Sequence, residues 1–147
     1  MDHVVYLDSK AKELENLLNK SKTMIIRGAM GRKLPHSRVN EKDTLYFINN
    51  NAEGQIKAKA SVSFVFNSEK MTTEESKQLI SKYQPQLQLT DAQFQRWAGK
   101  RYLVLISLKD IKEIPPFVID KSCFGNMDDW LLVEKIENVK KKHLIHL

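Results

Sequence analysis

The sequence predicts an α+β fold, a small mixed β-barrel with helices at its side. One segment alternates apolar and polar residues over a long run, other segments have the composition of short strands, and three segments have helical spacing with capping residues. Short strands with few helical crossovers favour a barrel over a parallel α/β sheet. By its length the chain is expected to form one domain, residues 1–147, with a tail at 140–147 that is partly frayed.

The three predicted helices lie in the first and middle parts of the chain. The first spans residues 8–20, where Asp8 or Ser9 can cap the N-terminus and leucines recur on one face. The second spans residues 72–83 and opens with a Thr followed three residues later by a Glu, the pattern of a capping box. The third spans residues 90–100 and ends near a glycine.

Strands are expected at residues 23–27, 44–48, 55–66 and 101–108, with a turn at 49–54. In the strand 55–66 we expect one set of side chains to face inward: Ala58, Ala60, Val62, Phe64 and Phe66. The alternate set should face outward: Lys57, Lys59, Ser61 and Ser63. The two prolines in residues 114–119 predict an irregular or edge segment. Residues 128–139 fit a strand or a short helix, and we expect a strand in their second half. The apolar faces predict a core that contains Leu14, Leu17, Ile26, Leu45, Val62, Phe64, Leu103 and Leu105.

Positive charge is concentrated in one part of this basic chain. The net charge is +6, and residues 22–42 hold six Lys or Arg against one Glu, a local charge of +5. Clustered cations of this kind favour polyanions, chiefly nucleic acid, although a solvated, solubilising surface would have the same composition. The single Cys123, the lack of a signal peptide and the lack of a long apolar run predict a soluble, cytoplasmic protein with no membrane partner.

The segment RGAMGRKLPHSRV, residues 27–39, is the best candidate for a binding loop, and we expect it to form one wall of a cleft for nucleic acid. Its glycines would allow the backbone to approach the ligand closely. Trp97 or Trp130 would stack a base, although a tryptophan is more often part of a core. The predicted nucleic-acid-binding residues are Arg27, Arg32, Lys33, Arg38, Lys57, Lys59, Trp97, Lys100, Arg101 and Trp130.

No motif in the sequence requires enzymatic chemistry. The one close pair of histidines, His143 and His146, lies in the tail without a cysteine partner, and neither a phosphate-binding loop nor a Gly-x-Ser-x-Gly motif is present. We therefore expect no metal, no cofactor and no catalytic residue, and a binding protein rather than an enzyme.

The segment LLNKSKTMIIRGAMGRKLPHSRVNEKDTLYFINN resembles the ASCH group of the PUA-like superfamily. Members have a helix, a strand similar to Lys-Thr-x-x-x-Arg, a loop, and a strand that begins after Gly-Asp. This sequence matches these motifs at Lys22, Thr23, Arg27 and Asp43, whereas Lys42 stands in place of the glycine. The later segment RYLVLISLKDIKEIPPF looks like the closing strand of the family and its proline-rich turn. The resemblance implies a PUA-like mixed β-barrel of five or six strands flanked by helices, with a cleft for RNA or a modified nucleoside.

The resemblance also implies an alternative function. Some small ASCH proteins are amidohydrolases that act on N4-acylated cytidine with a Lys, a Thr three residues later and a Glu elsewhere. Lys22 matches the first position, Ile25 replaces the threonine, and the sequence does not identify the glutamate. Because Ile25 has no hydroxyl group, we place amide hydrolysis second to nucleic-acid binding. A protein-interaction module remains as a second alternative.

Overall fold

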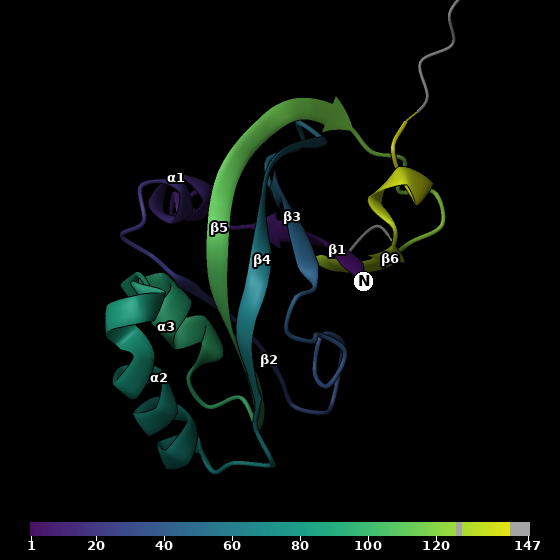
Figure 1. Ribbon diagram of the computed structural model, residues 1–147. Helices are drawn as coiled ribbons and strands as arrows, with labels where there is room; N and C mark the ends of the chain where they lie inside the picture. Colours follow the sequence, from purple (N-terminus) through teal and green to yellow (C-terminus); the bar gives the residue numbers. More distant parts are fainter. Residues whose placement is uncertain (126–127, 142–147) are drawn as a thin grey trace, which may run out of the picture.

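The computed structural model describes residues 1–125 and 128–141 (Figure 1). Its elements in chain order are β1 (Asp2–Leu7), α1 (Glu13–Leu18), β2 (Met24–Ala29), β3 (Thr44–Asn49), β4 (Gln55–Asn67), α2 (Thr73–Leu87), α3 (Asp91–Trp97), β5 (Tyr102–Val118), β6 (Trp130–Glu134) and a 3₁₀ helix (Ile136–Asn138).

The strands form one sheet in the order β2-β5-β4-β3-β1-β6. β1 and β3 are parallel, and all other neighbours in this order are antiparallel. The long strands β4 and β5 bend strongly, so that the sheet curls into a half-barrel, with α1, α2 and α3 on one side of β5 (Figure 1). The predicted α+β fold, a mixed β-barrel flanked by helices, is confirmed.

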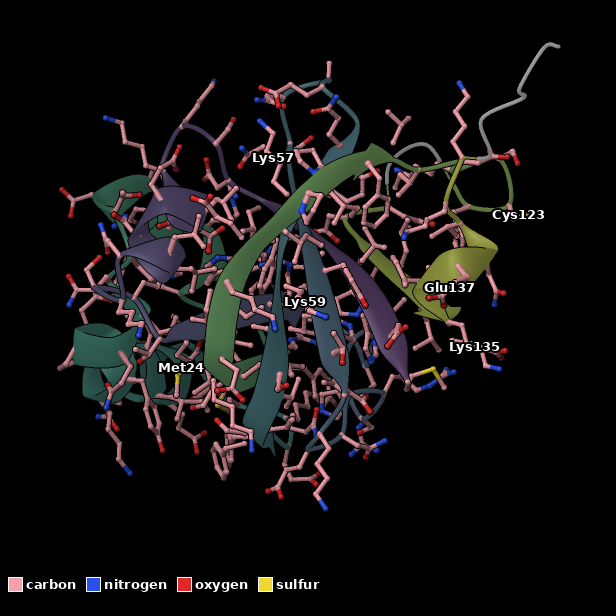
Figure 2. All side chains as sticks on the ribbon, turned by 45° about the horizontal axis from the view of Figure 1, so that its top comes forward. Met24, Lys57, Lys59, Cys123, Lys135 and Glu137 are labelled. Atoms are coloured by element: carbon pink, nitrogen blue, oxygen red, sulfur yellow. The ribbon has the colours of Figure 1, made fainter. Side chains whose placement is uncertain are left out.

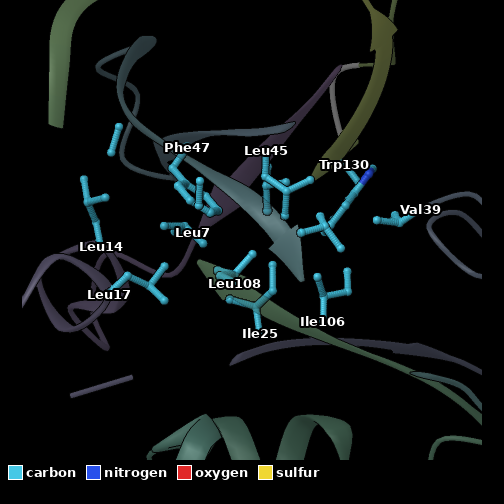
Figure 3. Packing of buried hydrophobic residues seen from close by; sticks show 14 of the residues in the cluster. Leu7, Leu14, Leu17, Ile25, Val39, Leu45, Phe47, Ile106, Leu108 and Trp130 are labelled. Atoms are coloured by element: carbon cyan, nitrogen blue, oxygen red, sulfur yellow. The ribbon is translucent and has the colours of Figure 1, made fainter. Parts of the chain in front are cut away.

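The buried residues form three clusters. The largest fills the inside of the curled sheet and includes Leu17 of α1, Phe47 of β3 and Trp130 of β6 (Figure 3). The second lies between β2, β5 and the helices α2 and α3. The third joins β1, β3 and β6 to the 3₁₀ helix. Burial of these apolar side chains on both faces of the sheet is the main source of stability in a fold of this size.

Seven of the eight residues that we expected in the core are buried, and the exception is Phe64, which is 43% exposed. The alternation in β4 holds up to Val62. A register shift against β5 between Val62 and Phe64 marks a β-bulge, and after it the facing of the side chains is reversed. Phe66 is therefore also exposed, at 37%, and the expectation that these two phenylalanines face inward is wrong.

The structure corrects three further element predictions. β5 continues through both prolines, because Pro115 and Pro116 lie where the register against β4 shifts and where β2 no longer pairs with β5. In residues 128–139 the strand occupies the first half, and the 3₁₀ helix follows it. β1 was not foreseen, although it pairs with both β3 and β6.

The helix predictions are largely confirmed. α2 begins with the predicted capping box at Thr72 and extends past the expected end to Leu87. α3 also begins with a capping box, at Thr90, which we had not predicted. α1 is shorter than expected, since residues 9–12 form turns before it. Of the helices in residues 1–125 and 128–141, none is long and apolar enough to cross a membrane. Most of the tail expected to fray, residues 142–147, lies outside the described residues, as do His143 and His146.

Candidate functional site

A cavity of about 360 Å³ opens where the C-terminal end of β1, the turns before α1, β2 and the end of α3 meet. Asn50, directly after β3, and Asp129, directly before β6, complete its wall. The lining residues are Tyr6, Leu7, Asp8, Ser9, Lys10, Glu13, Arg27, Asn50, Gln93, Arg96, Trp97 and Asp129. They include three cations (Lys or Arg) and three carboxylates, so the charges of the wall balance.

Arg27 is the central cation of this cavity, and it is only 7% exposed. Its guanidinium group donates to the backbone oxygens of Ile26 at 2.8 Å and of Tyr6 at 2.6 Å. It also lies 6.0 Å from the ring centroid of Trp97 and 5.7 Å from that of Trp130. Two carbonyls and two aromatic rings thus hold a buried positive charge in one orientation.

One nitrogen atom of the Arg27 guanidinium group, Nε, lacks a hydrogen-bond partner within the described part of the chain. This atom is buried, and the nearest carboxylate oxygen, Oδ2 of Asp129, lies 3.5 Å away. The Asp129 side chain is 58% exposed. A buried N–H group without a partner costs free energy. A ligand whose acceptor atom reached Nε would remove this cost by forming a hydrogen bond with it.

Trp97 forms the aromatic part of the wall. It is half-buried at the C-terminal end of α3, and the Arg96 guanidinium lies 5.9 Å from its ring centroid. Arg96 in turn lies 3.7 Å from the carboxylate of Asp8. A partly exposed indole beside guanidinium groups is a suitable surface on which a planar ring can stack.

Glu13 and Lys22 form a buried ion pair behind this wall. The Lys22 ammonium, 1% exposed, lies 3.4 Å from Oε2 of Glu13 and donates to the backbone oxygen of Leu87 at 2.5 Å. Burial lowers the pKa of Lys22, and the charge of Glu13 opposes this shift. Oε1 of Glu13 accepts from the Asp8 N–H at 2.9 Å, so both oxygens of this carboxylate at the cavity have a partner.

Sequence reasoning identified Lys22 but missed Glu13. The glutamate occupies the first turn of a predicted helix, where acidic residues are usual, and its burial arises only when α1 docks beside β2 and the end of α2. Lys22 itself is not among the residues that line the cavity. Ile25 is fully buried in the cluster inside the curled sheet, so no hydroxyl group stands at the position where the resemblance requires a threonine.

The two tryptophans have different environments. Trp97 lines the cavity, whereas Trp130 is 2% exposed and belongs to the core. The Trp130 Nε1–H donates to Nδ1 of His3 at 3.0 Å, and Nε2 of His3 lies 2.9 Å from Oδ2 of Asp43. His3 is therefore neutral with its proton on Nε2, and burial lowers its pKa.

The basic loop between β2 and β3, residues 30–43, is tied to the end of β4 rather than standing free. Nε2 of His36 lies 2.8 Å from the backbone oxygen of Ser68, and the Ser37 N–H donates to Oδ1 of Asn67 at 2.8 Å. Val39 is buried inside the curled sheet. The loop thus keeps a defined position, in which Lys33 and Arg38 are exposed.

Arg27 links the cavity to this loop, because it also lines a narrow hollow beneath residues 31–36. It lies within β2 and does not leave the strand end as expected. Gly28 faces β5: a Cβ atom there would lie 2.7 Å from Cδ2 of Leu103. Close packing of the sheet, and not the approach of a ligand, requires this glycine.

The remaining predicted cations lie outside the cavity lining. Arg32 is exposed and pairs with Glu69 at 2.9 Å. Lys57 pairs with Glu53, while Lys59 lies over the ring of Tyr46. Lys100 and Arg101 directly precede β5, and Lys100 packs near Gly28. The predicted cations are therefore distributed over the cavity, the loop and the sheet surface, not gathered in one cleft.

The sequence matches no family model and no curated protein. The fold, however, is similar to solved structures. The Y47F mutant of an ASCH protein from Zymomonas mobilis superimposes with a TM-score of 0.68 at 15% identity, covering 92% of both chains. The structure named ASCH from Zymomonas mobilis gives a TM-score of 0.64 at 16% identity, covering 93% of this chain and 92% of the other. This chain therefore has the fold of these ASCH structures.

Proposed function

We propose that this protein is a nucleic-acid-binding module that holds one base or modified nucleoside of an RNA in the cavity beside Trp97. The observation that carries the proposal is the buried guanidinium of Arg27, which has an unused Nε–H donor beside an aromatic wall. An acceptor atom on a planar ring satisfies both features at once. The size of the cavity, about 360 Å³, lies within the range of roughly 300–1,000 Å³ that small-molecule sites occupy.

The charge balance of the cavity supports a base rather than a phosphate as its occupant. Asp129 and Asp8 lie near the two arginines of the wall, and Glu13 adds a third carboxylate. A phosphate would meet these carboxylates at short range and be repelled, whereas a neutral base would not. In this proposal the exposed Lys33 and Arg38 of the loop contact the sugar-phosphate backbone outside the cavity.

The test is calorimetric titration with a panel of nucleosides, including N4-acetylcytidine, and with short RNAs that carry each of them once. Trp97→Ala is expected to weaken nucleoside binding by about 5- to 150-fold, since stacking on an aromatic ring contributes about 1–3 kcal/mol per base. Trp97→Phe should recover part of the affinity. Tyr83→Ala, which removes another half-buried aromatic residue, on α2 and outside the cavity, is the matched control. Equal affinities of the parent and Trp97→Ala for every nucleoside would refute the proposal.

Amide hydrolysis is a second candidate, favoured by one observation: a buried Lys–Glu pair, Lys22 and Glu13, stands behind the cavity wall. The reaction needs a nucleophile, and Ile25 cannot supply one. Incubation with N4-acetylcytidine decides between the candidates, because cytidine release that Lys22→Ala abolishes would establish hydrolysis. Binding without turnover is the result that we expect. A protein-interaction module would instead show salt-insensitive association with a protein and no affinity for RNA.

A further inference from the structure

Two phenylalanines project from the outer face of β4, and they belong to no part of the cavity. Phe64 and Phe66 are 43% and 37% exposed. Their partners on β5 are Ser107 and Leu105, whereas Ile106 between these two faces the inside of the sheet. Alternation along the strand therefore places both aromatic rings on the outer face, about 7 Å apart along β4.

The two phenylalanines lie at the margin of the helical layer. α2 and α3 pack on β2 and on Leu103 and Leu105 of β5, the strand next to β4, whereas Phe64 and Phe66 remain exposed. The bulge after Val62 is what turns Phe64 outward, so the exposure is built into the backbone of the strand. Two large exposed apolar side chains at alternate positions of one strand form a patch that indicates a binding surface.

Cations accompany this aromatic pair along the same face. Lys59 on β4 and Lys112 on β5 are direct cross-strand partners, and Lys109 pairs with Ser61. Figure 2 shows Lys59 projecting from the face of the sheet. Within residues 1–125 and 128–141, no ion pair engages any of these three lysines. Lys59 and Lys112 line an open hollow of about 420 Å³ whose one acidic lining residue is Asp110.

The basic loop runs along β4 beside the pair. The Lys42 N–H donates to the Val62 backbone oxygen at 2.9 Å, and the loop also contacts β4 directly after Phe66, through Asn67. Lys42 and Arg38 of this loop are exposed. The loop thus brings exposed cations to the strand that carries the two aromatic rings.

We propose that the outer face of β4 is a second site, one that binds single-stranded nucleic acid by stacking bases on Phe64 and Phe66. Exposed aromatic rings flanked by cations are the elements with which proteins bind single strands without sequence preference. The bases stack on the rings, and the phosphates meet Lys59, Lys109 and Lys112. A purely apolar protein partner would have to desolvate these lysines without a counter-charge, which disfavours it as the occupant.

This inference is independent of the function proposed for the cavity, because the two sites share no residue. A variant at Trp97 tests the cavity alone. A variant at Phe64 and Phe66 tests the sheet face alone. Failure of one proposal is therefore distinguishable from failure of the other.

The experiment is fluorescence anisotropy with a labelled, unstructured 12-nucleotide RNA of mixed sequence, at several salt concentrations. Phe64→Ser with Phe66→Ser should weaken binding by roughly tenfold or more and leave the salt slope unchanged, because stacking releases no counterions. The triple variant Lys59→Gln, Lys109→Gln, Lys112→Gln should make the slope of log K against log salt shallower by about 2. Each lost phosphate contact to a single strand reduces this slope by about 0.7. Phe64→Tyr with Phe66→Tyr should bind as the parent does.

Two controls accompany these variants. Met30→Ser removes another exposed apolar side chain, 53% exposed, and should leave RNA affinity unchanged. An unfolding curve of the double Ser variant that matches the parent shows that the fold is intact, as expected for exposed positions.

Two results would overturn the inference. One is RNA binding by the folded double Ser variant with parental affinity. The other is a concentration-dependent dimer of the parent, seen by size-exclusion chromatography with light scattering, that the Phe64→Ser and Phe66→Ser changes abolish. In that case a second copy of the chain covers this face. A monomeric parent together with weakened RNA binding by the variant would support the inference.

Discussion

The buried pair of Lys22 and Glu13 allows a quantitative test of how the wall of the cavity is held. Replacing Lys22 by Met keeps most of the side-chain volume but removes the ammonium group. The Glu13 carboxylate, 5% exposed, then has no counter-charge at 3.4 Å, and the backbone oxygen of Leu87 loses its donor. Breaking a buried ion pair by removing one partner costs about 3–5 kcal/mol.

This loss is large compared with the total stability of a domain, roughly 5–15 kcal/mol. With a urea dependence of about 2 kcal/mol per M, the midpoint of unfolding of Lys22→Met should decrease by roughly 1.5–2.5 M. Urea denaturation followed by circular dichroism measures it. Lys20→Met is the matched control, because Lys20 is exposed two residues earlier, and its effect should stay within about 0.5 kcal/mol.

The double variant of Lys22→Met with Glu13→Gln gives the decisive comparison. The neutral amide can still accept the Asp8 N–H through its oxygen, so no buried charge is left without a partner. The Leu87 oxygen and the new NH2 group are neutral, and each costs about 1–3 kcal/mol where it stays unpaired. The double variant should therefore be more stable than Lys22→Met alone. A double variant that is less stable than Lys22→Met, or a single variant that costs under 1 kcal/mol, would show that this ion pair does not hold the cavity wall.

Three further predictions concern the pH dependence, the loop and the sheet. Burial lowers the pKa of His3, so below about pH 6.5 the unfolded chain binds a proton that the folded chain does not. The free energy of unfolding should therefore fall as the pH decreases from 7.5 to 5.5, and it should fall by less in His3→Asn. Parallel curves of unfolding free energy against pH for the two proteins would contradict this. Replacing Arg32 and Lys33 together by Ala should weaken RNA binding across sequences and make the slope of log K against log salt shallower by about one to two units. An unchanged affinity and slope would show that the loop is only a solvated surface. Gly28→Ala should cost about 1–3 kcal/mol of unfolding free energy, because the added Cβ would clash with Leu103 of β5. Gly31→Ala is the control, since a Cβ there has open space around it, and it should change the stability little. Equal thermal midpoints of the two variants would argue against the clash.

Local sequence determined the elements whose stabilising contacts are local. The capping boxes at Thr72 and Thr90 place the starts of α2 and α3, because each cap bonds to a residue three positions away. The alternation of β4 up to Val62 identifies the face that enters the core. The resemblance to ASCH domains also rests on short segments, and the similarity in fold agrees with it.

Contacts between distant segments decided the rest. The bulge that exposes Phe64 arises from the register of β4 against β5, and the same pairing lets β5 run through its two prolines. No local pattern encodes a register, so alternation alone placed Phe64 in the core.

The site depends still more on tertiary structure. Trp97 and Trp130 both have charged neighbours in the sequence, yet one lines a cavity and the other is buried against His3, at the opposite end of the chain. Glu13 becomes a cavity residue only because Lys22 and the end of α2 converge on it. The sequence determines which side chains are available, whereas burial and charge pairing depend on which of them the folded chain brings within a few ångströms of each other.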